Sequence, residues 1–141
     1  MMTRRLANPP TMQHILSHTA GLTYGGLLPG LESPVDQAYQ DLGIVRGDGE
    51  TLLEFSDKLG RVPLLYDPGQ KWCYSLATDV CGALVEIISG QPFESFLCER
   101  IFDPLNMTDT GFRITDEKLD RFAACYMRSM DKQVLLEDDP H

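Results

Sequence analysis

Residues 129–132, Ser-Met-Asp-Lys, form the segment whose spacing most directly offers covalent chemistry. In the pattern Ser-x-x-Lys, one helical turn places a lysine amine beside a serine hydroxyl, so that the amine can take the proton of a nucleophilic serine. The chain around Ser129 is predicted to be a hairpin turn and not a helix, so the two side chains would not stack in this way. We therefore interpret the match as accidental.

The spacing of His14 and His18, four residues apart, allows two metal ligands on one face of a helix. The predicted helix ends near Ser17, however, and no glutamate stands between the two histidines to act as a base. We favour a structural role, in which His18 and Thr19 bond the local backbone. The four cysteines lack the close pairs typical of zinc sites, so no metal site is predicted and the thiols are interpreted as reduced. These cysteines are Cys73, Cys81, Cys98 and Cys125.

Two longer blocks carry a more specific signal: residues 11–22 (Thr-Met-Gln-His-Ile-Leu-Ser-His-Thr-Ala-Gly-Leu) and residues 66–76 (Tyr-Asp-Pro-Gly-Gln-Lys-Trp-Cys-Tyr-Ser-Leu). Together with segments 79–93 and 101–112, which follow in the same order, they resemble the β-lactamase-like serine hydrolases. This family includes class C β-lactamases, penicillin-binding proteins and related esterases. The resemblance implies the mainly helical subdomain of the β-lactamase/transpeptidase-like α/β fold, here incomplete. It also implies hydrolysis or acyl transfer through an acyl-serine intermediate, with no metal or organic cofactor.

Tyr74 is the candidate catalytic residue that the resemblance implies. It corresponds to the tyrosine of the family's Tyr-x-Asn motif, which moves the proton of the nucleophilic serine to the leaving group. Leu76 stands where β-lactamases have the asparagine, so we expect an ester in preference to a β-lactam substrate. Leu76 and Trp72 are the candidate substrate contacts, and the expected partner is a small-molecule ester or amide.

The family's serine and lysine lie upstream of the first block, and a glycine-containing strand motif lies downstream of the tyrosine. We expect both to be missing from these 141 residues, so that the chain alone is an inactive fragment. Two alternatives remain open. One is a non-catalytic binding or interaction module derived from the fold, with self-association of the truncated chain; the other is an esterase assembled from separately encoded pieces.

Helices and a final hairpin are the elements that must position these residues. Apolar spacing, N-cap residues and terminal glycines predict helices opened by Thr11, Ser33, Thr51, Ser75 and Pro92. Their predicted ends lie near Ser17, Gly43, Gly60, Gly90 and Pro104. Residues 122–127 and 134–136 are predicted to be the two strands of a hairpin. The resulting fold is mainly α with a small β-hairpin: one partial domain, helical over about 9–112, with the hairpin over about 122–137.

The stripes of large apolar residues predict that the core forms around the helices starting at Ser75 and Pro92. Gly60 is predicted to be a left-handed helix cap.

The net charge of -9 over 141 residues would repel a phosphate backbone, so nucleic acid is excluded as a partner. No segment is long and apolar enough to span a bilayer, and the first ten residues do not form a secretory signal. These features and the scattered cysteines predict a cytoplasmic protein without a membrane partner.

Overall fold

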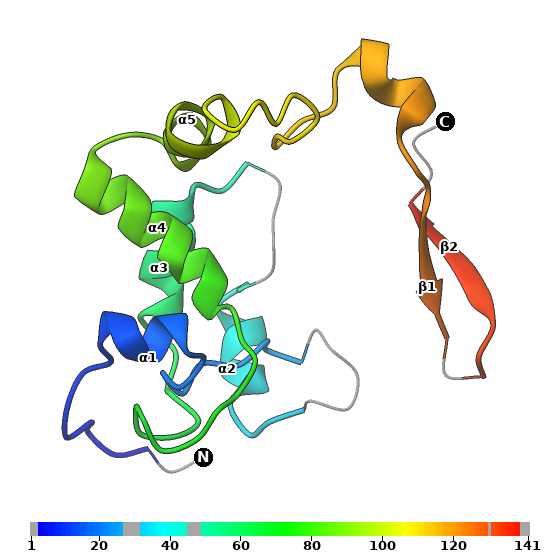
Figure 1. Cartoon of the computed structure of the whole chain (residues 1–141). Coiled ribbons are helices and arrows are strands. Elements are labelled where there is room, and N and C mark those ends of the chain that lie inside the picture. The colour runs from blue at the N-terminus through cyan, green and yellow to red at the C-terminus, as the bar shows by residue number, and fades with distance from the viewer. Residues whose placement is uncertain (1–2, 27–31, 45–48, 130, 139–141) are drawn as a thin grey trace. The chain divides into compact units, whose positions relative to one another are not determined.

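The computed structural model describes residues 3–26, 32–44, 49–129 and 131–138. The chain divides into two compact units, Met1–Phe96 and Leu97–His141, which we describe separately. The first unit contains the helices α1 (Met12–Leu16), α2 (Asp36–Asp41), α3 (Leu52–Leu59), α4 (Ala77–Ser89) and most of α5 (Phe93–Leu97) (Figure 1). The predicted fold class, mainly α with a small β-hairpin, is confirmed.

Local capping explains where α1 and α3 begin. Both start with a capping box, in which the hydroxyl of the N-cap threonine accepts the backbone N–H three residues later and that third residue bonds back to the N-cap N–H. The partners are Thr11 with His14 and Thr51 with Glu54, and the hydrogen bonds of their backbone N–H groups are 3.0–3.4 Å long. The Thr51 N–H and the Thr51 hydroxyl both donate to the Glu54 carboxylate, and these two hydrogen bonds lower its pKa. The predicted N-caps Thr11 and Thr51 are therefore confirmed.

Two predicted N-caps and the conformation of one predicted C-cap are wrong. Ser33 does not cap α2, whose N-cap is Val35; instead the Ser33 hydroxyl donates to the buried Asp36 carboxylate at 2.5 Å. Gly60 ends α3 with φ of -65°, in the right-handed region, so it is not a left-handed cap. The N-cap of α4 is Leu76 and not Ser75, because the Ser75 hydroxyl is bonded elsewhere.

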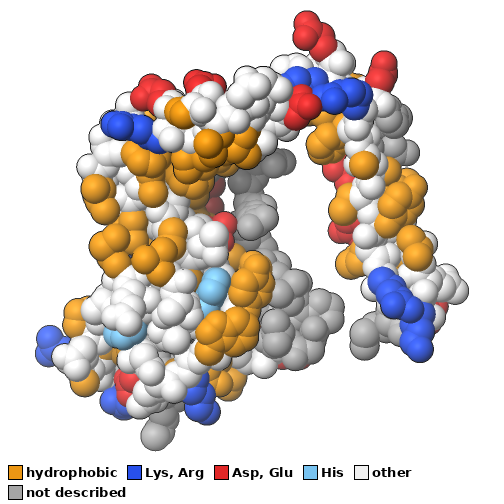
Figure 2. Space-filling view, viewed as in Figure 1, with side chains coloured by type: hydrophobic (Ala, Val, Ile, Leu, Met, Phe, Trp, Pro, Cys, Tyr) orange, Lys and Arg blue, Asp and Glu red, His pale blue; other side chains and the backbone are white. Residues whose placement is uncertain are grey.

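The core of the first unit is built by residues from α1, α2, α3 and the loops between them, closed by the first turn of α4. Its buried members are Ile15, Ala20, Leu22, Val35, Tyr39, Ile44, Phe55, Leu59, Val62, Leu76 and Ala77. The predicted core around α4 and α5 is wrong: Ile87 and Ile88 are 64% and 70% exposed, and α5 has no buried residue. Figure 2 shows hydrophobic side chains on the visible face over α4.

The packed face of α4 carries small residues in place of the large ones. Ala77, Gly82 and Ala83 are its buried residues, and α4 packs against α3 and α1 (Figure 1). A Cβ atom on Gly82 would lie 3.1 Å from a methyl carbon of Leu52 in α3, so the helices approach closely at this glycine. Because α4 and α3 lie so close together, the packed face of α4 has small residues. The large apolar residues of α4 therefore did not predict where the core lies.

The second unit contains a π-helical turn (Cys98–Phe102), a 3₁₀ helix (Asp116–Arg121) and a hairpin of strands β1 (Cys125–Arg128) and β2 (Val134–Asp138). The strands are antiparallel, with Tyr126 opposite Leu136 and Arg128 opposite Val134. All residues of both strands are exposed, and Figure 2 shows hydrophobic side chains along the hairpin. The predicted hairpin is confirmed, with strands displaced by a few residues from their predicted bounds.

No helix among the described residues is long and apolar enough to cross a membrane.

Candidate active site

The two sequence blocks 11–22 and 66–76 lie against each other in the first unit. Four backbone hydrogen bonds of 2.8–3.2 Å join the segments 18–23 and 65–76. The donor and acceptor atoms are Leu65 N and Gly21 O, Gly69 N and Thr19 O, Cys73 N and His18 O, and Leu76 N and Thr23 O. These bonds fix the path of the loop that carries Trp72 and Tyr74 into α4.

Gly21 permits this close approach. Its φ is +84°, a left-handed conformation that residues with a Cβ rarely adopt, and a Cβ built there would lie 2.3 Å from the Tyr66 carbonyl oxygen. The tight contact with backbone explains why glycine is needed at this point of the first block.

Gly21→Ala is expected to lower the free energy of unfolding by roughly 2–5 kcal/mol, because left-handed strain and steric overlap with the Tyr66 carbonyl add together. Urea denaturation followed by circular dichroism measures this change. Gly43→Ala is the matched control: Gly43 also has positive φ, of +61°, but a Cβ there has no neighbour within 4 Å. It should cost only about 1–2 kcal/mol. Equal losses in the two variants would contradict the steric explanation.

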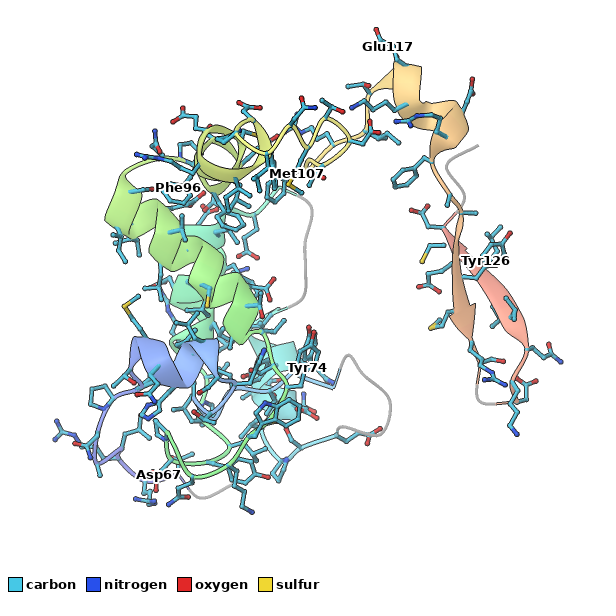
Figure 3. The ribbon with its side chains drawn as sticks, in the orientation of Figure 1. Asp67, Tyr74, Phe96, Met107, Glu117 and Tyr126 are labelled. Carbon is cyan, nitrogen blue, oxygen red and sulfur yellow. The ribbon has the colours of Figure 1, made fainter. Side chains whose placement is uncertain are left out.

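Four ring side chains, His18, Tyr24, Trp72 and Tyr74, form what we call the aromatic row. The Tyr74 ring lies 4.9 Å from the His18 ring, 5.2 Å from the Tyr24 ring and 6.4 Å from the Trp72 ring, measured between centroids. The Tyr24–Tyr74 and Trp72–Tyr74 pairs are stacked, with interplanar angles of 29° and 21°. Trp72 is 67% exposed and Tyr74, labelled in Figure 3, is 46% exposed, so the row presents apolar ring surface to solvent.

The structure thus brings the predicted site residues Tyr74 and Trp72 together on one exposed surface. Leu76 is separated from them: its side chain is 1% exposed and belongs to the core. In this position the leucine side chain supports the start of α4. The substrate contact expected of Leu76 stays a prediction.

The buried hydrogen-bond partners of His18 and of the neighbouring Thr23 were not predicted from the sequence. Nδ1 of His18 lies 3.3 Å from the hydroxyl of Ser75, which is 2% exposed. The fully buried Tyr39 accepts the Thr23 N–H with its hydroxyl oxygen at 3.1 Å, and burial raises the pKa of Tyr39. Tyr39 of α2 is thereby bonded to Thr23, whose carbonyl oxygen accepts the Leu76 N–H. The sequence predicted the helix that carries Tyr39, but not the partner of Tyr39 across the fold.

The two histidines do not share a helix face. α1 ends at Leu16, and His18 has a left-handed backbone with φ of +53°. His14 accepts the Thr11 N–H with Nδ1 as part of the capping box. Across the described ranges, no group of three or more His, Cys, Asp or Glu residues could hold a metal ion.

Ser129 lies in the loop between β1 and β2 and not on a helix. Its hydroxyl donates to the Asp131 carboxylate and to the main-chain oxygen of Gln133, and the first of these bonds lowers the pKa of Asp131. Lys132 donates its backbone N–H to the Ser129 carbonyl and has φ of +67°. The middle position Met130 lies outside the described residues. The helical geometry that Ser-x-x-Lys chemistry requires is therefore not formed between Ser129 and Lys132.

The four cysteines are free. Burial raises the pKa of the Cys73 and Cys81 thiols and so disfavours their thiolate form.

The chain matches a known family over nearly its whole length. The model of the beta-lactamase family matches residues 2–140, and the chain belongs to this family. Its fold neighbours and relatives include esterases, acyltransferases and homologues of penicillin-binding proteins.

Three relatives illustrate the similarity. The chain is 38% identical to esterase EstB of Burkholderia gladioli over 133 residues, which are 91% of this chain and 32% of EstB. It is similar to the solved structure of EstCE1, a hydrolase with promiscuous acyltransferase activity, with a TM-score of 0.76 and 34% identity over 97% of this chain and 36% of that one. Simvastatin synthase LovD from Aspergillus terreus gives a TM-score of 0.67 and 31% identity over 96% and 32% of the two chains. The chain spans about a third of the length of the curated relatives it matches.

Proposed function

We propose that residues 1–141 are the tyrosine-bearing part of an esterase or acyltransferase that works through an acyl-serine intermediate. The observation that carries this proposal is the aromatic row, in which the half-exposed Tyr74 stands at the entrance to α4 and contacts His18, Tyr24 and Trp72. Family membership and the similarity to EstB and EstCE1 support the reaction class.

Tyr74 acts as the proton carrier in this proposal. With its phenol group deprotonated, Tyr74 takes the proton of the attacking serine hydroxyl on its ring oxygen as the serine oxygen bonds to the ester carbonyl carbon. The proton then passes to the alkoxide that leaves, so the alcohol is released and an acyl-serine ester remains. Attack by water gives a hydrolase, and attack by a second alcohol gives an acyltransferase.

We propose a small-molecule ester as the substrate. The exposed indole of Trp72 offers an apolar face beside Tyr74, suited to the acyl or alcohol group of such an ester. At position 76 the chain has a buried leucine, which cannot hydrogen-bond the side-chain amide of a β-lactam. The four free cysteines are in keeping with a cytoplasmic location.

The nucleophilic serine is proposed to come from outside residues 1–141, because Ser129 is held in the hairpin loop by Asp131 and Gln133. A fluorophosphonate probe should leave the 141-residue chain unlabelled. It should label a chimera in which residues 1–141 replace the matched region of EstB, at a serine outside those residues. Stoichiometric labelling of Ser129 in the short chain would contradict the proposal.

The same chimera tests the substrate class. A p-nitrophenyl ester should be hydrolysed faster than a cephalosporin, by about one to two orders of magnitude in kcat/KM, because an unpaired amide costs about 1–3 kcal/mol. Unmodified EstB, assayed in parallel, shows what the exchanged region contributes. Faster hydrolysis of the cephalosporin would exclude the ester preference.

A further inference from the structure

His18 contacts three consecutive residues of the loop that carries Tyr74. Its main-chain oxygen accepts the Cys73 N–H at 2.8 Å, its ring lies 4.9 Å from the Tyr74 ring, and its Nδ1 lies 3.3 Å from the Ser75 hydroxyl. Two of these contacts use the imidazole ring: one is with Tyr74 itself, and the other is with Ser75, the next residue in the chain. Both can therefore influence the orientation of the Tyr74 ring.

The geometry points to His18 as a positioning residue for Tyr74: Ser75 fixes the plane of the imidazole, and the imidazole fixes the phenol ring. The catalytic meaning of this orientation rests on the proposed function, whereas the orientation itself does not.

The imidazole is fixed from the buried side. Ser75 is 2% exposed and His18 is half-buried, so the hydrogen bond between the Ser75 hydroxyl and Nδ1 is partly shielded from water, whichever of the two atoms donates. The imidazole also has an edge-on contact with Trp72, at 6.3 Å and 66°. A ring held at these two points has few orientations available.

The backbone of His18 has an unusual conformation. Its φ of +53° lies in the left-handed region, which is uncommon for residues other than glycine and asparagine. Such a conformation persists where the surroundings determine it, and here the carbonyl bond to Cys73 and the N–H bond to the Ile15 carbonyl, at 3.2 Å, hold it. The side chain therefore leaves the backbone in a direction that points it at the loop of Tyr74.

Tyr74 needs such support because 46% of its surface is exposed and it lies in a loop, before the first residue of α4. Stacking on Tyr24 restrains the ring but leaves rotation within the stacking plane open. The tilted contact with His18, at 48°, restrains that rotation. Two rings at different angles hold the phenol more tightly than one.

Two variants separate the side-chain role from the backbone role. His18→Asn keeps a residue that tolerates positive φ and removes the imidazole. Ser75→Ala keeps His18 and its backbone bonds and removes only the anchor of the imidazole. His14→Asn is the matched control, because the same exchange four residues upstream alters the capping box of α1 and no contact of Tyr74.

The readout is the χ1 rotamer of Tyr74, measured from NMR three-bond couplings in the 141-residue chain, with thermal unfolding to confirm that each variant is folded. We expect one rotamer in the unmodified chain and in His14→Asn, and averaging over several rotamers in His18→Asn and Ser75→Ala. A single Tyr74 rotamer in both folded variants would overturn the positioning role. If His18→Asn fails to fold, Ser75→Ala alone decides.

Kinetics of the EstB chimera then separate this inference from the proposed function. His18→Asn should lower kcat for the p-nitrophenyl ester about 10-fold or more, with KM changed less than about twofold, because a displaced catalytic group slows chemistry more than binding. Averaged rotamers with an unchanged kcat would support the positioning of Tyr74 and overturn its catalytic role. A loss of kcat with a single rotamer retained would overturn the positioning role.

Discussion

Tyr74→Phe is expected to lower kcat for ester hydrolysis by about 10²- to 10⁴-fold in the EstB chimera, since positioned proton transfer contributes this much to catalysis. The substitution removes the phenol oxygen and keeps the ring that stacks on Tyr24 and Trp72. Steady-state kinetics with a p-nitrophenyl ester measure the effect, and KM should change little because the ring surface is preserved.

Tyr66→Phe is the control for this experiment. Tyr66 lies in the same sequence block, and its ring contacts the Lys71 ammonium at 4.7 Å, a contact that phenylalanine keeps. Its kcat should stay within a few-fold of the parent. Full activity of Tyr74→Phe would remove Tyr74 from the reaction and leave the aromatic row as a binding surface only.

Leu76→Asn should lower the free energy of unfolding by roughly 3–6 kcal/mol, although it restores the Tyr-x-Asn pattern of the family. Leu76 is 1% exposed in the core, so the change combines lost apolar burial with a buried amide that needs new partners. This is a large fraction of the about 5–15 kcal/mol that stabilises a typical domain.

Urea denaturation of the 141-residue chain measures this loss, with Leu53→Asn as the control. Leu53 is 47% exposed on α3, so the same exchange there should cost less than about 1 kcal/mol. A Leu76→Asn variant as stable as Leu53→Asn would mean that position 76 can turn toward solvent.

Local signals in the sequence were sufficient for much of the fold. The N-caps Thr11 and Thr51 were predicted from their residue type, and the capping boxes found there join residues only three apart. The hairpin was equally local, because its two strands are joined by one short loop. These elements were predicted because their stabilising contacts lie within a few residues.

The predictions were wrong where the structure of a segment depends on a residue far away in the sequence. Ser75 was predicted to cap α4, but its hydroxyl bonds to His18, 57 residues away in the sequence. The periodicity of α4 showed an apolar stripe, yet the face that packs on α3 is the one with Gly82 and Ala83. Periodicity describes a helix and says nothing of its neighbour.

The candidate site, too, was predicted only in part. Tyr74 and Trp72 were identified because their block resembles a family, whereas their contacts with His18 and Tyr24 join segments about 50 residues apart. No spacing rule predicts which ring of one segment meets which ring of another.

The joining of segments 18–23 and 65–76 also has a consequence for how the site forms. All four backbone bonds between them close loops of more than 40 residues, and the chain must lose the entropy of closing such a loop before any of the bonds contributes. Short helices such as α1 and α3 need no such closure and can form early, but the aromatic row is assembled only when the ends of this long loop meet. The row therefore belongs to the late, cooperative stage of folding, and the Cys73 and Leu76 amides should exchange with solvent only through opening of the whole first unit.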